Sequence, residues 1–265
     1  MSQAQSWSRR RAVATVTVAG MAVVAVVVGA VVSLYLTFRP ATDAEQSAAA
    51  GGQGPEQLVM VGDRDQIAAA PMLEITPADA TGGTPATSLP EHIVIPRPTD
   101  SGPARIPTGF PRTPEGAVGQ LNAIVSEVVT VMSIPHAHEV YEAWSAPGAG
   151  PAQDWSMTQN VARFLESAGI PGQSADGRVQ VAVTPQAGQI KGGDGPDWVV
   201  ACVLLTLEAS YERRAEVAYG HCERMTWDID RWVIDEGAAP AVAPSTWAGT
   251  DLAARAGWRT WSWAD

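Results

Sequence analysis

WVVACVLLTL, the run from Trp198 to Leu207, is an uncharged segment rich in strand-forming residues. We predict that it forms a strand, and that the segment from Ala215 to Trp227 forms the next one. A hairpin that turns at Glu212-Arg213 would place Cys202 opposite Cys222. A non-hydrogen-bonded antiparallel pair brings two Cα atoms to about 4.5 Å, which is within disulfide range. The register favours a cross-strand disulfide over two buried free thiols that pack as small hydrophobic residues.

Helical patterns precede this hairpin. Thr113-Pro114-Glu115 offers an N-cap residue, a proline at the first helical position and an acid in the first turn, so it opens a helix that ends before Pro135. A second helix is predicted from Pro135 to Trp144, and a third begins with a capping box at Ser156 and stops at Gly169. Alternation then predicts strands over Arg178–Val183 and Arg231–Ile234, with a loop over Pro185–Pro196 between the first of these and the hairpin. Helices followed by antiparallel strands predict an α+β domain over residues 108–236.

A long uncharged run lies near the N-terminus. The 27 residues between Arg11 and Arg39 carry no charge, which predicts a transmembrane helix over residues 12–38. Three arginines, Arg9 to Arg11, precede the run and one follows it, so residues 1–11 are expected in the cytoplasm and the rest outside, anchored in the cell membrane by a single pass. A secretory signal cleaved near Ala41–Ala44 is the alternative, but its apolar core would be shorter.

The charge balance constrains the partners. The chain has 17 basic and 28 acidic residues, a net charge of −11. Without the three cytoplasmic arginines, 14 basic and 28 acidic residues remain, a net charge of −14. Direct binding to nucleic acid is therefore not expected, because it depends on contacts between basic residues and phosphates. The exported side of a membrane is oxidising, which suits a Cys202–Cys222 disulfide.

The segments on either side of the predicted domain are rich in small residues and prolines. Residues 39–107 are expected to form a flexible stalk and arm, with short strand candidates at Leu58–Val61, Met72–Ile75 and His92–Ile95. Residues 237–265 form a tryptophan-rich tail. Its residues Trp258, Trp261 and Trp263 are candidates for partner binding, since aromatic residues concentrate at interface hot spots, although they are also suited to pack the tail against the sheet.

Three groups of residues resemble functional sites without matching one. His136, His138 and Glu139 lack the usual zinc spacing, and the two histidines could share a metal only from an extended or loop backbone. Glu142 is four residues after His138 and could join it. Asp194 and Asp197 lie in a glycine-rich connection that lacks the acidic alternation of a calcium loop. His221 and Cys222 are adjacent in a strand and would face opposite sides of the sheet. We predict no catalytic residue, no bound metal and no cofactor.

A family resemblance agrees with this organisation. Gly109–Ala117, Tyr219–Trp227 and Arg231–Ile234 resemble the corresponding segments of actinobacterial single-pass membrane proteins of conjugative and mobile elements. The resemblance implies helices packed on a curved, cone-like antiparallel sheet, similar to the nuclear transport factor 2-like superfamily. It also implies a likeness to the bitopic assembly factors of type IV secretion, which are scaffolds, so no catalytic residue is carried over.

We therefore expect a non-enzymatic, membrane-anchored assembly component of a cell-envelope conjugation or secretion apparatus. Its expected partners are other envelope or transfer-machine proteins, and a second copy of the chain is a further candidate. The alternative is an exported ligand-binding or enzymatic domain with an apolar pocket inside the cone. Its polar lining would come from Glu208, Tyr211, Arg213 and Asp228.

Overall fold

The computed structural model describes residues 60–61, 63–88, 90–175, 177, 179–210 and 214–265. The predicted cytoplasmic tail (1–11), transmembrane helix (12–38) and first part of the stalk (39–59) lie outside these residues. Among the helices that the structure describes, none is both long enough and apolar enough to cross a bilayer.

A seven-stranded sheet forms the centre of the molecule. Its strands follow the order β2-β9-β5-β6-β7-β8, and β1 pairs with β5. The strands are β1 (Met60–Val61), β2 (Ile93–Ile95), β5 (Gln180–Gly193), β6 (Trp198–Ser210), β7 (Arg214–Asp228), β8 (Arg231–Ile234) and β9 (Arg259–Trp263). Two further short strands, β3 (Asp100–Ser101) and β4 (Pro107–Thr108), pair separately. The pairs formed by β5 to β8 are antiparallel, and the predicted hairpin is β6–β7.

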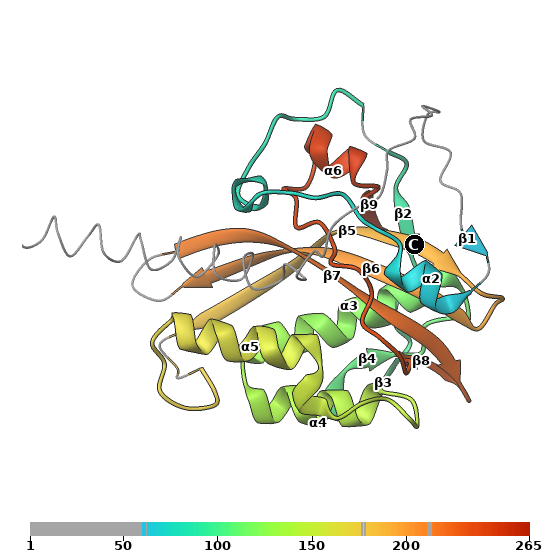
Figure 1. Cartoon of the computed structure of the whole chain (residues 1–265), viewed down its shortest axis with the longest axis horizontal. Helices are drawn as coiled ribbons and strands as arrows, with labels where there is room; N and C mark the ends of the chain where they lie inside the picture. The colour runs from blue at the N-terminus through green and yellow to red at the C-terminus, as the bar shows by residue number, and fades with distance from the viewer. Residues whose placement is uncertain (1–59, 62, 89, 176, 178, 211–213) are drawn as a thin grey trace, which may run out of the picture.

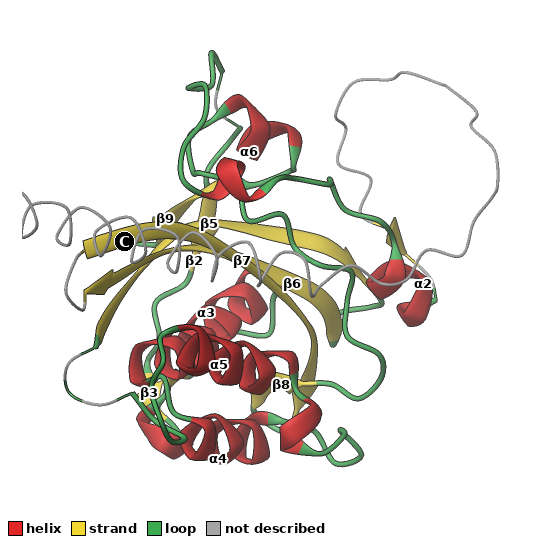
Figure 2. Ribbon diagram, turned by 60° about the vertical axis from the view of Figure 1, so that its left-hand side comes forward, coloured by secondary structure: helices red, strands yellow, loops and turns green. Residues whose placement is uncertain are grey.

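The sheet is strongly curled, like half a barrel, and three helices fill its concave side (Figures 1 and 2). These helices are α3 (Pro114–Val131), α4 (Ile134–Trp144) and α5 (Ser156–Ser167). Thr113 caps α3 as predicted, since its hydroxyl accepts a hydrogen bond from the Gly116 N–H at 3.1 Å. The prediction of an α+β fold with helices on a curved sheet is confirmed, although the sheet is mixed, since β1–β5 and β2–β9 are parallel pairs.

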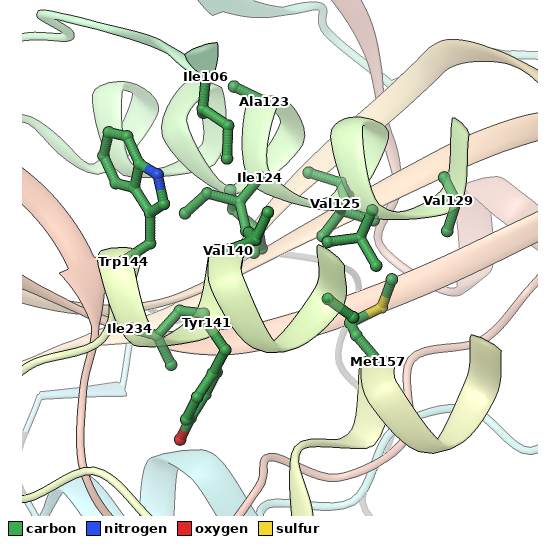
Figure 3. Close-up of a cluster of buried hydrophobic side chains, with 14 of the residues drawn as sticks. Ile106, Ala123, Ile124, Val125, Val129, Val140, Tyr141, Trp144, Met157 and Ile234 are labelled. Carbon is green, nitrogen blue, oxygen red and sulfur yellow. The ribbon is translucent and has the colours of Figure 1, made fainter. Parts of the chain in front are cut away.

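The larger core lies between α3 and the sheet. Alternate residues of β6, including Val199, Val203 and Leu205, face this side and are fully buried or nearly so. Within this core, side chains from α3, α4 and α5 converge on one another, and the Tyr141 hydroxyl points away from them (Figure 3). Gly188 allows β5 to lie close to α3, because a Cβ at this position would be 2.9 Å from Cγ1 of Val118.

A second, smaller core covers the convex side. The other face of β6 contributes Trp198, Val200, Cys202 and Leu204 to it. Segments from both ends of the described chain pack over these residues: α2 (Arg64–Ala69), the short 3₁₀ helix η1 (Pro77–Ala80) and α6 (Asp251–Arg255). Two further 3₁₀ turns, η2 (Pro103–Arg105) and η3 (Ala152–Asp154), lie near α4.

Part of the expected flexible arm packs into the fold, and its strand candidate His92–Ile95 forms β2. Ile93 and Ile95 are fully buried in the larger core, and Val94 between them is 53 % exposed. Their strand, β2, pairs in parallel with β9 from the predicted tail, with Ile93 opposite Trp261. The arm and the tail thus each add a strand to the sheet. The expected domain, residues 108–236, included neither of these strands.

Local boundaries also differ from the predictions. The predicted loop over Pro185–Pro196 is strand as far as Gly193, because register shifts at Pro185/Ala187 and Ile190/Gly192 accommodate proline and glycine as bulges. The Ser156 capping box does not form, since Trp155 is the N-cap residue and Ser156 is already helical. Of the three strand candidates in the arm, Met72–Ile75 is not a strand.

Candidate functional site

The predicted disulfide is present. Cys202 and Cys222 are directly opposite in the β6–β7 register and are bonded to each other. The bond lies in the smaller core, where Cys222 Sγ is 3.8 Å from Met72 Sδ. It therefore ties the two central strands together on the convex side and lies beneath the arm.

His221 faces the opposite side of the sheet from Cys222, as predicted, and belongs to a buried polar row. Glu223 Oε1 accepts a hydrogen bond from Trp155 Nε1 at 2.7 Å and is 2.8 Å from His221 Nε2. His221 Nδ1 is in turn 3.3 Å from the Tyr219 hydroxyl, which accepts a hydrogen bond from Asn160 Nδ2 at 2.7 Å. Three alternate residues of β7 thus connect to α5 through a continuous chain of polar contacts.

Burial dominates the electrostatics of this row. It raises the pKa of the Tyr219 hydroxyl, and it also raises the pKa of Tyr141, with a further contribution from the negative charge of Glu223. Both phenols stay protonated at neutral pH. Because each member of the row has a protein partner and His221 and Glu223 are 7 % and 5 % exposed, the row fastens α5 to the sheet.

The three tail tryptophans have different environments. Trp258 lies in the smaller core with 2 % of its surface exposed, and its indole N–H donates to the Pro244 carbonyl at 2.9 Å, so it is not a surface residue. Trp261 and Trp263 are half-buried on one side of β9, with ring centroids 5.1 Å apart. Arg97 lies over the Trp263 ring at 5.9 Å. Partner binding stays a prediction for Trp261 and Trp263 and does not suit Trp258.

The histidine cluster does not assemble. His136 and His138 are both on α4, where residues two apart diverge. His136 is held between two carboxylates, with Nε2 2.9 Å from Glu127 Oε1 and Nδ1 3.1 Å from Glu139 Oε2. Within the part of the chain that the structure describes, no group of three or more histidines, cysteines or acids is placed to hold a metal ion.

The two aspartates of the glycine-rich connection form ion pairs. Asp194 accepts a hydrogen bond from Arg64 Nε at 2.9 Å, which joins α2 to the β5–β6 turn. Asp197 pairs with the guanidinium of Arg112, whose hydrogen bonds lower the pKa of that carboxyl. Both carboxylates therefore act as anchors for neighbouring segments.

A polar pocket of about 300 Å³ opens on the convex side of the sheet. Two rows of side chains across the strands form its floor: Glu208 of β6 lies opposite Glu216 of β7, and Thr206 lies opposite Thr184 of β5. Trp247 lines it from the tail, and its backbone N–H donates to the Asp79 carbonyl of η1 at 2.7 Å. Trp247 thus lines the same pocket as the two carboxylates.

A second pocket, of about 200 Å³, continues the first along β5. The two share Gln186 and Ala248, and together they form what we name the outer groove. The lining of the second pocket is more apolar and includes Pro90, Leu204, Ala253 and Trp258. The outer groove therefore has an acidic end, near the tip of the β6–β7 hairpin, and an apolar end near α6.

Of the four residues expected to line an internal pocket, the two that the structure describes do not converge. Glu208 lies in the outer groove on the convex side, and Asp228 ends β7, where it is opposite Arg231. Tyr211 and Arg213 lie outside the described residues. The outer groove could not be predicted from local sequence, because Trp247 joins it from the tail, although the alternation of polar residues at Thr184 and Gln186 is a local sign of an accessible strand face.

Comparison with known proteins adds no relative: no family model, no curated protein and no solved structure matches this chain.

Proposed function

We propose that this protein is a non-enzymatic assembly component of a cell-envelope conjugation or secretion apparatus. In this proposal residues 12–38 hold it at the membrane with the N-terminus in the cytoplasm, and the folded region acts outside as a protein-docking module. Other envelope or transfer-machine proteins are its partners.

The observation that supports the proposal best is that a helix fills the concave face of the sheet. In a cone-shaped ligand-binding or enzymatic domain this face would line the pocket. Here α3 packs into it, and Val118, Leu121 and Val125 have no exposed surface. The two pockets described above open on the convex face instead, where a protein partner has direct access.

Two further features agree with a location outside the cytoplasm. The Cys202–Cys222 disulfide is typical of an oxidising compartment. The net charge of the chain, −11, favours solubility and repels nucleic acid, which suits an exported module that binds proteins.

The membrane anchor has a direct test. The mass of the mature N-terminus, measured on protein purified from its own membranes, is expected to match a chain that retains residues 12–38. A mature chain that begins near Asp43 would mean that the run is a cleaved signal, and the anchored part of the proposal would fail.

The assembly role is tested by capture. The full chain, crosslinked in intact cells and purified in mild detergent, is expected to retain proteins of a transfer or secretion apparatus. Recovery of the chain without any envelope protein, under conditions that keep known membrane complexes together, would contradict the role.

A further inference from the structure

We propose that the outer groove binds an extended segment of a partner protein, with an arginine or lysine at the acidic end and a large apolar side chain at the other end. This inference rests on the proposed function, since it identifies the surface through which the module docks.

The acidic end has an unbalanced charge. Glu208 and Glu216 lie directly opposite each other, an arrangement that is unfavourable for like charges. The guanidinium of Arg214 pairs with both, at 3.3 Å from Glu216 Oε1. Among the residues that the structure describes at this end, two carboxylates and one arginine leave a net charge of −1, so a second cation would be attracted to it.

The geometry beside the carboxylates suits a cationic side chain. Trp247 lines the same pocket, and an aromatic face next to carboxylates is a favourable environment for a guanidinium or ammonium group. The side chains of Glu208 and Glu216 are 30 % and 43 % exposed, so they are accessible without being fully hydrated. The acidic chain as a whole would also attract basic partners.

The length and lining of the outer groove suit a peptide. The distance along β5 from Ala182 to Ala187 is about 16 Å, which an extended segment of about five residues would span. The side chains of Thr184, Gln186 and Thr206 have no hydrogen bond to another described residue, so they are available to peptide groups. At the far end, Pro90, Ala248 and Ala254 are partly exposed and offer apolar surface.

The test uses two labelled peptides and the full chain in mild detergent. The first peptide has the sequence Arg-Ala-Ala-Ala-Leu with a fluorescent label, and the second carries uncharged citrulline in place of arginine. Fluorescence anisotropy is expected to show binding of the arginine peptide with a Kd below about 1 mM, and binding of the citrulline peptide that is weaker by about tenfold.

Two variants locate the binding. Glu208→Gln combined with Glu216→Gln keeps the side-chain volumes and is expected to weaken binding of the arginine peptide by about tenfold. The matched control is Glu166→Gln, which removes one exposed carboxylate from α5 on the other side of the sheet and is expected to bind within about twofold of wild type. Thermal melting verifies that each variant remains folded.

Three results would overturn the proposal: no binding of the arginine peptide up to about 1 mM, equal binding of both peptides, or wild-type affinity in the double variant. The capture experiment separates this failure from that of the proposed function. If wild type and double variant capture the same envelope proteins, the assembly role stands and the outer groove is not the docking surface. If the peptides behave as expected but wild type captures no envelope protein, the binding site stands and the assembly role fails.

Discussion

Reduction of the Cys202–Cys222 disulfide is expected to destabilise the folded region by about 3 kcal/mol. The two cysteines are 20 residues apart, and closing a loop of this size in the unfolded chain accounts for about 3 kcal/mol at 25 °C in the chain-entropy model. The native register does not depend on the bond, since β6 and β7 are paired along their whole length and packed on both faces. The reduced protein is therefore expected to remain folded but less stable.

The assay is thermal unfolding of the full chain in mild detergent, followed by circular dichroism with and without reductant. A loss of about 3 kcal/mol corresponds to a fall in Tm of roughly 6–12 °C for a folded region of this size. The double variant Cys202→Ala, Cys222→Ala is the control, since its Tm should not respond to reductant. A shift below about 2 °C, or the same shift in the control, would refute the reasoning.

Three further predictions concern other parts of the fold. Burial lowers the pKa of Lys191 to about 8 from 10.5, so the unfolded chain binds more protons between these values and stability should rise with pH across that window. We expect this rise to be about 1 kcal/mol, because the Lys191 side chain is half-exposed. Lys191→Met should abolish the rise when denaturation is measured as a function of pH, and an unchanged slope in the variant would contradict the prediction. Glu223→Ala leaves the N–H groups of Trp155 and His221 without their acceptor and should cost about 2–4 kcal/mol in denaturant titrations, whereas a neutral effect would mean that the buried row does not fasten α5. Ile93→Ala should cost about 2–5 kcal/mol by the same measurement, and a loss below about 1 kcal/mol would fit the flexible arm that the sequence suggested.

Local sequence patterns predicted the central hairpin and the helices, because the residues that specify these elements are close together in the sequence. The register that places Ser210 opposite Arg214 also places Cys202 opposite Cys222, and capping residues mark the start of α3. The side on which His221 lies followed from strand alternation alone. These features do not require knowledge of any distant segment.

Features that combine distant segments could not be predicted in this way. β2 and β9 are far apart in the sequence, and although His92–Ile95 was a strand candidate, nothing near it indicated that it pairs with residues of the tail. Pro185 suggested a loop, whereas the bulge beside it keeps β5 in the sheet. The outer groove likewise needs Trp247 to pack beside β5, β6 and β7, which depends on the backbone contact between Trp247 and Asp79.

The central claim is that the folded region is a docking module and that partners contact the outer groove. Photo-crosslinking in intact cells tests it most directly, with benzoylphenylalanine placed either at Thr184 in the outer groove or at Glu166 on α5. We predict a crosslink to a protein of a transfer or secretion apparatus from Thr184 and none to that protein from Glu166. No crosslink from Thr184, or the same crosslinked protein from both positions, would contradict the account.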